Sequence, residues 1–217
     1  MHEIGVREVV TFAGMQFNIQ TLEMTWLAMA IVILIAFLAT RSLKLVPSGW
    51  QNVIEMVIVW LNEQIGVTLG SRGQLVAPFL ITLFLFLLIS NWIGLIPTLA
   101  SPTNDLNTTL GLALLVIVML HVLGLYYKGF NYIKHFFQPV APFVIINLIE
   151  EIAKPITLAF RLFGNIVAGE ILLEVLYNLP WFVPVPWIWI AFSLFIGIIQ
   201  AFIFTVLTAS YLGMGLS

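Results

Sequence analysis

Long apolar runs, separated by short polar stretches, dominate the pattern of this chain. A helix needs about 20 mostly apolar residues to cross the hydrocarbon layer of a bilayer. Residues 21–40 and 78–99 each supply such a run, and each is followed by polar or turn-forming residues. The pattern therefore predicts two spans there. A third span, with Asn107 or Thr108 as its N-cap, would complete a helical hairpin over 78–128.

The segments between and before these runs differ in pattern. In 48–66 apolar residues recur at helical spacing, but Glu55, Asn62 and Glu63 interrupt them. Such a segment is more typical of an amphipathic helix in the membrane interface than of a span. Residues 1–20 carry charges without a continuous apolar core. We expect an N-terminal tail there, on the outer side, and no cleavable signal peptide.

The segment 140–214 predicts two unusually long helices. Helical patterning continues over 142–179 and again over 186–213, on either side of a proline-rich turn. At 1.5 Å per residue these helices are about 57 and 40 Å long, more than a hydrocarbon core of about 30 Å. We expect a strongly tilted helical hairpin, with a bend at Pro155. The predicted fold is an all-α polytopic membrane protein with five spans and one interfacial helix.

Composition narrows the class further. The chain is 61% hydrophobic and 8% charged, with a mean hydropathy of +1.10, which excludes a soluble domain of this size. A net charge of −2 gives no reason to expect a nucleic-acid partner. The absence of cysteine excludes disulfides and thiolate metal sites. His2, His121 and His135 are scattered, so neither a metal nor a cofactor is predicted.

The basic residues predict the orientation of the spans. With the N-terminus outside and five spans, a single basic residue, Arg7, lies on the outer side. The opposite side then carries five: Arg41, Lys44, Arg72, Lys128 and Lys134. Loops rich in lysine and arginine stay in the cytoplasm. We therefore expect a multi-pass protein of the cell (inner) membrane, with its C-terminus in the cytoplasm.

Arg161 is the residue in the apolar segments that most needs explanation. An arginine at the middle of a bilayer costs from about 2.5 to more than 10 kcal/mol. A chain accepts that cost where a fixed positive charge is required, which favours ion handling. The alternative is a structural arginine that reaches a headgroup or pairs with Glu170 or Glu174.

A polar stripe extends along the same predicted helix. At 100° per residue its members fall within about 60° of one another over about 22 Å. They are Glu150, Lys154, Thr157, Arg161 and Asn165. The small residues Gly164 and Ala168 continue the edge of this stripe and permit another helix to approach closely, as does Gly197 on the last helix.

Glu170 does not belong to this stripe. It lies nine residues beyond Arg161, which is about 180° around the helix and 13–14 Å along it, and Glu174 follows one turn later. We infer two polar compartments, one opening at Glu150 on the inner side and one at Glu170 and Glu174 on the outer side, with Arg161 between them. For Glu150 and Lys154 a structural ion pair, four residues apart, is an equal alternative.

The last predicted helix carries a milder set of polar residues. Gln200 and Ser193 lie seven residues apart, at helical spacing, in a stretch without charge. An amide in lipid must find a hydrogen-bond partner. Contact between helices is the simpler interpretation for Gln200, and a role beside Arg161 or the outer compartment is the alternative.

At this point the residues resemble a known family. The sequences that carry the resemblance are Lys154-Pro155, Arg161-Leu-Phe-Gly-Asn165, Ala168-Gly169-Glu170, Gln200-Ala-Phe-Ile-Phe-Thr205, Asn91-Trp-Ile-Gly-Leu-Ile-Pro97 and Pro102-Thr-Asn-Asp-Leu-Asn-Thr108. They are similar to subunit a of F-type ATP synthases, over nearly the whole chain after the tail.

The resemblance implies a stator for rotary ion translocation. Its implied partners are a ring of c subunits, each with a mid-membrane carboxylate, the peripheral-stalk b subunit and the rest of the F1Fo complex. Arg161 matches the family's essential arginine, which separates two half-channels for protons or sodium ions. Glu170 matches the acid of the outer half-channel, and Asn165 and Gln200 match polar residues near the arginine. Ser193 stands where some members have a histidine, so the lining of the outer half-channel differs here.

Two other functions fit the sequence less well. A self-contained secondary transporter could use Arg161 as a charge anchor, but the chain has no internal repeat and no paired broken helices. An intramembrane hydrolase would need a nucleophile with a base, and no G-x-S-x-G motif is present. The chain also has no phosphate-binding loop. It is therefore predicted to be an ion-translocating subunit with no catalytic site of its own.

Overall fold

Helices form almost all of the described structure. The computed structural model describes residues 9–12, 15–41, 44, 47, 49–96, 99–129, 132, 143–178 and 185–216. In chain order the elements are β1 (Val9–Phe12), β2 (Met15–Asn18), α1 (Ile19–Thr40), α2 (Trp50–Leu69), η1 (Gly70–Leu75), α3 (Ala77–Ile93), η2 (Pro102–Asn104), α4 (Leu106–Lys128), α6 (Phe143–Tyr177) and α7 (Val185–Leu216). The first part of the predicted tail, most of the connection before α6 and the turn before α7 lie outside the described residues.

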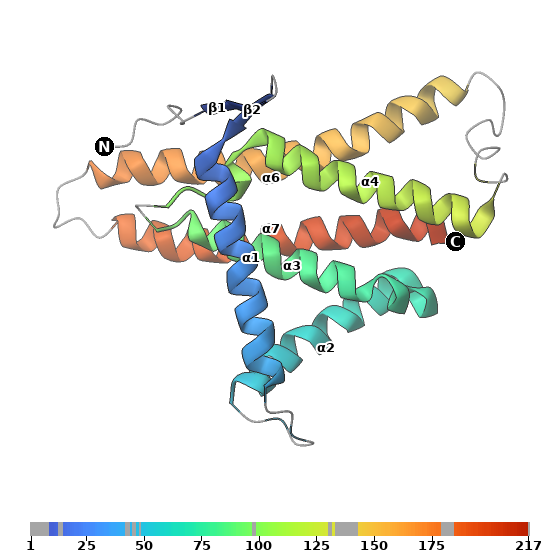
Figure 1. Ribbon diagram of the computed structural model, residues 1–217, viewed down its shortest axis with the longest axis horizontal. Helices are drawn as coiled ribbons and strands as arrows, with labels where there is room; N and C mark the ends of the chain where they lie inside the picture. Colours follow the sequence, from blue (N-terminus) through green and yellow to red (C-terminus); the bar gives the residue numbers. More distant parts are fainter. Residues whose placement is uncertain are drawn as a thin grey trace.

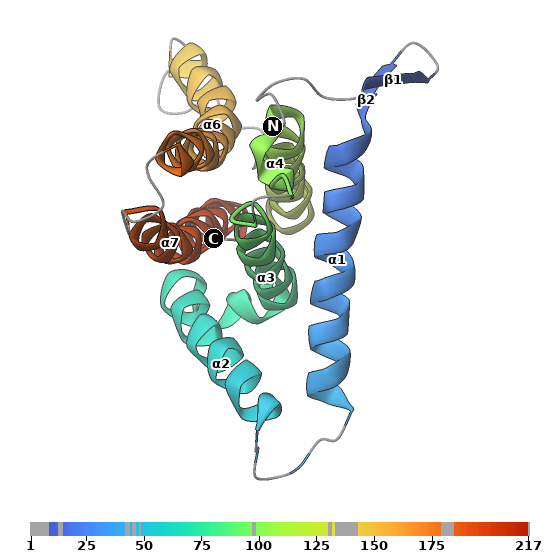
Figure 2. The ribbon, with the colours of Figure 1, turned by 90° about the vertical axis from the view of Figure 1, so that its left-hand side faces the viewer.

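The helices are arranged around the pair α6 and α7. These two pack against each other, and α3 and α4 pack on them, while α1 stands on the other side of α3 and α4 (Figure 2). α1 runs steeply across the direction of α4 and α7 (Figure 1). In the described part of the chain four helices, α1, α4, α6 and α7, are long and apolar enough to cross a membrane, and α3 is a shorter apolar helix. The predicted helical membrane fold with two long, packed C-terminal helices is confirmed.

The second predicted span is shorter than expected. α3 ends at Ile93, six residues before the predicted end. The chain then turns at Gly94, where the backbone N–H groups of Leu95 and Ile96 donate to the carbonyls of Trp92 and Ile93, each at 3.1 Å. These bonds to residues only three positions back replace the α-helical ladder, so the polar connection begins earlier than the apolar pattern indicates.

The N-terminal ends of α1 and α4 are joined by Asp105. Its Oδ1 accepts a hydrogen bond from the backbone N–H of Asn107 at 2.9 Å, so Asp105, not Asn107 or Thr108, is the N-cap of α4. A carboxylate suits this place because helix N-termini attract negative charge. Its Oδ2 accepts from Asn18 at 3.3 Å and from the Thr21 hydroxyl at 3.1 Å. Asn18 ends the unpredicted antiparallel hairpin of β1 and β2.

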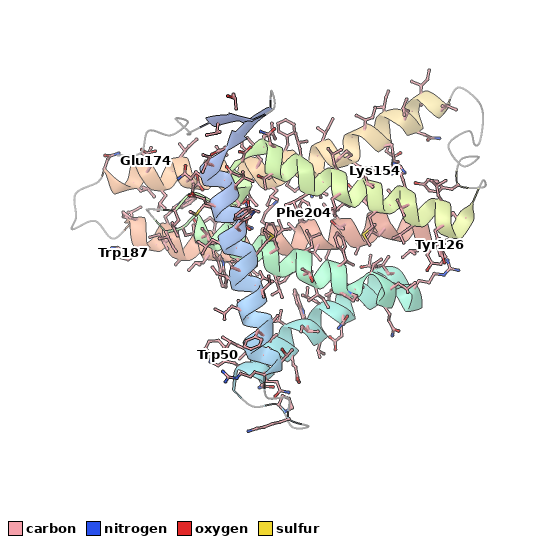
Figure 3. All side chains as sticks on the ribbon, in the orientation of Figure 1. Trp50, Tyr126, Lys154, Glu174, Trp187 and Phe204 are labelled. Carbon is pink, nitrogen blue, oxygen red and sulfur yellow. The ribbon has the colours of Figure 1, made fainter. Side chains whose placement is uncertain are left out.

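The core lies where α3, α4, α6 and α7 meet. Phe204, labelled in Figure 3, is 1% exposed and packs in one cluster with Leu87, Val116, Leu158 and Leu162. Between helices in lipid such packing contacts provide the attraction that the hydrophobic effect provides in water. This core fixes the relative positions of the polar residues on α6 and α7.

Two basic side chains bind the end of α7. Lys128 Nζ donates to the backbone carbonyl of Met214 at 2.8 Å, and the guanidinium of Arg72 donates to the carbonyl of Leu216. The last carbonyls of a helix lack partners within it and carry partial negative charge. Lys128 and Arg72 therefore cap α7 and hold it against α4 and η1.

Candidate functional site

The sequence-predicted polar residues of α6 are spread along the whole helix. Arg161 lies midway between two carboxylates, about 15 Å along the helix from Glu151 and 13–14 Å from Glu170. Its side chain is exposed and makes no hydrogen bond or ion pair with the residues that the structure describes. Figure 3 labels Lys154 and Glu174 toward opposite ends of α6. The arginine thus separates two polar regions, and pairing with Glu170 or Glu174 is not what holds it.

Glu170 is bound by the connection between α3 and α4. Its Oε1 accepts from the backbone N–H of Ser101 at 3.3 Å, and its Oε2 accepts from the side-chain amide of Asn104. A Cβ added at Gly94 would lie 2.9 Å from Oε1. The bare backbone of Gly94 therefore gives the carboxylate room to reach the connection.

A buried hydrogen-bond network stands behind this contact. The Ser101 hydroxyl donates to the carbonyl of Ser90 at 2.9 Å and lies 2.7 Å from the Thr103 hydroxyl. The Thr103 hydroxyl donates to Asn91 Oδ1 at 3.0 Å, and Asn91 Nδ2 donates to the carbonyl of Gly197 at 3.2 Å. Because buried polar networks are rigid when each member has a partner, the connection is fixed to both α3 and α7.

A cavity of about 180 Å³ adjoins Glu170, and we call it the Glu170 pocket. Its lining brings together three predicted site residues, Glu170, Asn165 and Ser193. It is completed by Asn91, Gly94, Leu95, Ile166, Ala168, Gly169, Leu172, Trp189, Ile196 and Gly197. Trp189 Nε1 donates to the carbonyl of Gly169 at 3.3 Å and so ties α7 to α6 at the pocket. The lining is mostly apolar, but its volume and the polar groups of Glu170, Asn165, Ser193 and Asn91 suit a few water molecules.

A second polar group, the Glu151 cluster, lies toward the other end of α6. It consists of Glu151, Lys154, His121 and Tyr132. Lys154 Nζ donates to Glu151 Oε2 at 2.7 Å, and the two side chains are only 11% and 13% exposed. Glu151 Oε1 lies 3.6 Å from His121 Nε2, and His121 Nδ1 lies 2.8 Å from the Tyr132 hydroxyl. The alternative pair of Lys154 with Glu150 is wrong, because Lys154 is paired with Glu151 and the exposed Glu150 forms no ion pair with it.

Tyr132 is held in a close fit against α4. A Cβ added at Gly124 would lie 2.4 Å from the Tyr132 ring, so a larger residue has no room there. Burial, with the charge of Glu151 as a smaller cause, raises the pKa of Tyr132 to about 12. The phenol is therefore protonated at ordinary pH and remains a hydrogen-bond donor or acceptor for His121.

The remaining predicted residues do not gather at one point. Glu174 is exposed, and its backbone carbonyl accepts from Asn178 at 3.1 Å. Gln200 is 5% exposed, and its Nε2 has no hydrogen-bond partner among the described residues. No described contact joins it to Arg161. Buried amide groups need a partner, which a water molecule or a neighbouring chain can supply.

The small residues behave differently on the two helices. A Cβ added at Gly197 would lie 3.3 Å from Trp92, so the expected close contact is confirmed there. At Gly164 an added Cβ meets nothing within 4 Å, and Ala168 is exposed. The described part of this chain provides no close contact at these two α6 positions, so the expectation that another helix packs there stays a prediction.

Several residues of both sites escaped the sequence analysis. Ser101 is predicted only as part of a turn, and Thr103 and Asn104 carry the family resemblance without a predicted role, although their polar side chains follow an apolar run. No site role is predicted for Glu151 from the sequence, and His121 is treated only as one of three scattered histidines. The available signal was a group of polar residues directly after an apolar helix. The sequence does not show what they bind, because Ser101 and Asn104 lie 69 and 66 residues before their partner Glu170.

Comparisons with known proteins decide the family. A sequence model described as "ATP synthase A chain" matches residues 22–213. The chain is 44% identical to ATP synthase subunit a of Desulforamulus reducens, over 91% of this chain and 79% of that protein. The chain belongs to the ATP synthase subunit a family. It is also 42% identical to ATP synthase subunit a of Acidothermus cellulolyticus, over 96% of this chain and 81% of that protein.

Membership fixes the general role of the molecule. As a subunit a of the Fo sector the chain is a multi-pass membrane protein that translocates ions, and it is not itself the catalytic subunit. A self-contained transporter is therefore set aside. Within the described residues no group of three or more histidine, aspartate or glutamate side chains is placed to hold a metal ion.

Proposed function

We propose that the chain provides two offset half-channels for protons or sodium ions, with Arg161 separating them. The observation that carries this proposal is the placement of Arg161. It is exposed at the middle of α6, and none of the described residues forms a hydrogen bond or an ion pair with it. A charge at such a place is costly unless another molecule pairs with it. The ionised carboxylate of a neighbouring rotor subunit has the charge and the depth that this requires.

The exposed face of α6 supports a helical partner beside Arg161. Ile149, Ile156 and Phe160 are 61%, 42% and 52% exposed, and no described residue lies within 4 Å of a Cβ added at Gly164. Apolar side chains with small residues between them suit close packing by other membrane helices. We propose that the c-subunit ring covers this face. Trp26, Ile33 and the rest of the exposed side of α1 are left for lipid and the peripheral-stalk b subunit.

We assign one half-channel to the Glu170 pocket and the other to the exposed surface beside Glu150. We propose that ions reach the ring from the outer side through the Glu170 pocket, where Asn165 and Ser193 add polar groups and Glu174 lies one turn further along α6. The inner half-channel opens beside the exposed Glu150, with Lys154 one turn away. Gln200, buried on α7, completes the polar groups near the rotor. The basic-residue pattern supports an N-terminus outside and a C-terminus in the cytoplasm of a bacterial inner membrane.

The test is ATP-driven ion pumping by the complete complex in lipid vesicles. Arg161→Ala should abolish pumping, because no other described charge lies exposed at the middle of α6, and Arg161→Lys should also fail substantially, because an ammonium lacks the delocalised fork of a guanidinium. Arg41→Ala, which removes an exposed arginine at the end of α1, is the matched control and should pump like the wild type. Pumping near the wild-type rate in Arg161→Ala would refute the proposal.

A further inference from the structure

The contacts of Glu170 raise the question of what sets its charge. Both of its oxygens accept hydrogen bonds from the connection before α4, one from the Ser101 backbone and one from the Asn104 side chain. Hydrogen bonds donated to a carboxylate favour its ionised form over its protonated form. The Asn104 amide belongs to a side chain, so a substitution can remove this donor without changing the backbone.

The donors are held in place independently of Glu170. The backbone N–H of Asn104 donates to the Ser101 carbonyl at 3.0 Å. The Ser101 hydroxyl is fixed to Ser90 and to Thr103, which is buried. Since the connection keeps its shape through these bonds, truncating the Asn104 side chain removes a donor without removing the scaffold that carries it.

The charged groups on the elements around the Glu170 pocket define the setting in which the Asn104 donor acts. On α6, Arg161 lies two and a half turns before Glu170, and Glu174 lies one turn after it. The connection contributes Asp105, whose carboxylate is bound by Asn18 and Thr21. The residues that α3 and α7 contribute to the pocket lining include no acid and no base.

We propose that Asn104 is a positioning residue that holds the Glu170 carboxylate against the Ser101 amide and favours its ionised form, and that it thereby sets the pH range over which the pocket accepts a proton. The proposal rests on the proposed role of Glu170 in the outer half-channel. Asn104 itself carries no proton. It acts through the geometry and the charge of its partner.

Two measurements on the complete complex test this role. The first is the infrared carbonyl band of the protonated Glu170 carboxyl, titrated with pH and assigned by its loss in Glu170→Gln. The second is the rate of ATP-driven pumping as a function of pH on the pocket side. The variants are Asn104→Ala, which removes the donor, and Asn104→Asp, which keeps the shape and adds a negative charge. Asn107→Ala, an exposed asparagine three residues away, is the matched control.

Asn104→Ala should move the half-protonation point of the Glu170 band to higher pH by about half a unit to one unit, the size expected for one lost hydrogen bond to a charged group. Asn104→Asp should move it further, because two carboxylates side by side disfavour ionisation. The pumping profile should shift in the same direction, and Asn107→Ala should match the wild type.

The outcomes separate the two proposals. An unshifted Glu170 band in both Asn104 variants overturns the role of Asn104. If Asn104→Asp does not assemble, an unshifted band in Asn104→Ala is enough to overturn it. A lower pumping rate with an unshifted band and an unshifted profile would also overturn it, because a purely structural role predicts that result. If Glu170→Gln pumps normally while the band shifts as expected, Asn104 positions Glu170 but the proposed outer half-channel fails.

Discussion

Two glutamates on α6 have opposite surroundings, although they lie on one helix. Glu170 is held by neutral donors beside a cavity. Glu151 is paired with Lys154 at 2.7 Å and faces His121, and its buried Oε1 accepts no hydrogen bond from the described residues. The hydrogen bonds that Glu170 accepts from Ser101 and Asn104 come from neutral groups. Protonating Glu151, in contrast, would leave the nearly buried ammonium of Lys154 without its carboxylate partner, at high cost. The first environment suits proton exchange, and the second suits a fixed link between helices.

The residues around the two glutamates differ in the same way, with neutral groups near Glu170 and charged or aromatic groups near Glu151. The network behind Glu170 consists of hydroxyl, amide and backbone groups. The groups around Glu151 come from α4, α6 and the residue Tyr132, and Lys154 also approaches the Tyr211 ring of α7 at 6.0 Å. We therefore expect changes near Glu170 to alter ion movement and changes near Glu151 to alter stability.

The largest expected effect comes from exchanging each glutamate for glutamine. Glu170→Gln keeps the shape but cannot take up a proton, so ATP-driven pumping should fall by about a hundredfold. Glu151→Gln, measured per assembled complex, should pump within about twofold of the wild type, since no proton transfer is assigned to it. Equal losses of pumping in the two variants would remove the distinction between the sites.

Removing the cation of the Glu151 cluster should have the next largest effect. Lys154→Met leaves a nearly buried carboxylate unpaired and should lower the free energy of unfolding by about 3 kcal/mol. Unfolding of the purified complex in mixed detergent, followed by circular dichroism, measures the change. The double variant Lys154→Met with Glu151→Leu should recover most of the loss, because no charge is then left alone. A single variant as stable as the wild type would show that the ion pair contributes nothing.

Two glycines allow the comparison to be tested by size alone. An added Cβ would lie 2.4 Å from the Tyr132 ring at Gly124 and 2.9 Å from Glu170 Oε1 at Gly94. Overfilling a packed site costs about 1–3 kcal/mol. Gly124→Ala should therefore lower the unfolding temperature with little change in pumping per assembled complex. Gly94→Ala should reduce pumping beyond any loss of assembly, because it displaces the carboxylate. The reverse pattern would contradict the assignment of the two regions.

The smallest expected effect concerns Tyr132 and depends on pH. Its pKa is about 12 in the folded chain, against 10 for an ordinary tyrosine. The stability that comes from keeping this phenol protonated is complete below pH 10 and is lost as the pH rises toward 12. Tyr132→Phe should cost about 1 kcal/mol near pH 8, from the lost hydrogen bond to His121.

This effect is checked by measuring the unfolding free energies of the wild type and Tyr132→Phe at several pH values. The gap in unfolding free energy between the wild type and Tyr132→Phe should shrink from pH 10 to pH 12. A constant gap over that range would mean that the Tyr132 phenol is not stabilised in its protonated form.

The sequence predicted those parts of the fold that depend on one segment at a time. α1, α4, α6 and α7 follow from apolar runs long enough to span a bilayer. The end of α3 was misplaced because the residues after Ile93 are as apolar as the helix itself, and only the contacts of Gly94 with Ser101 and Glu170 show why the chain turns there. The strands of the β1–β2 hairpin have four residues each. They are too short to show a clear alternation of apolar and polar residues in an N-terminal tail that contains both.

In the candidate site, too, the sequence predicts only the features that depend on a single helix. Arg161 and Glu170 stand out as charges in apolar surroundings, and the helical repeat alone places them on different faces. The choice of Glu151 over Glu150 as the partner of Lys154 depends on which side of α6 meets α4 and α7. The donors of Glu170 depend on where a distant connection folds back. Neither is a property of a single helix.

The binding of Arg72 and Lys128 to the end of α7 has a consequence for experiments on membrane insertion. These residues are among the cations that the positive-inside rule counts when it orients the chain. In the folded chain the same two side chains are occupied by the carbonyls of Leu216 and Met214. A charge reversal designed to flip the topology would therefore also release a helix terminus. Reporter fusions that measure the orientation of the chain therefore need a separate measurement of folding. At Arg72 and Lys128 the same side chains orient the chain during insertion and hold the end of α7 in the folded protein.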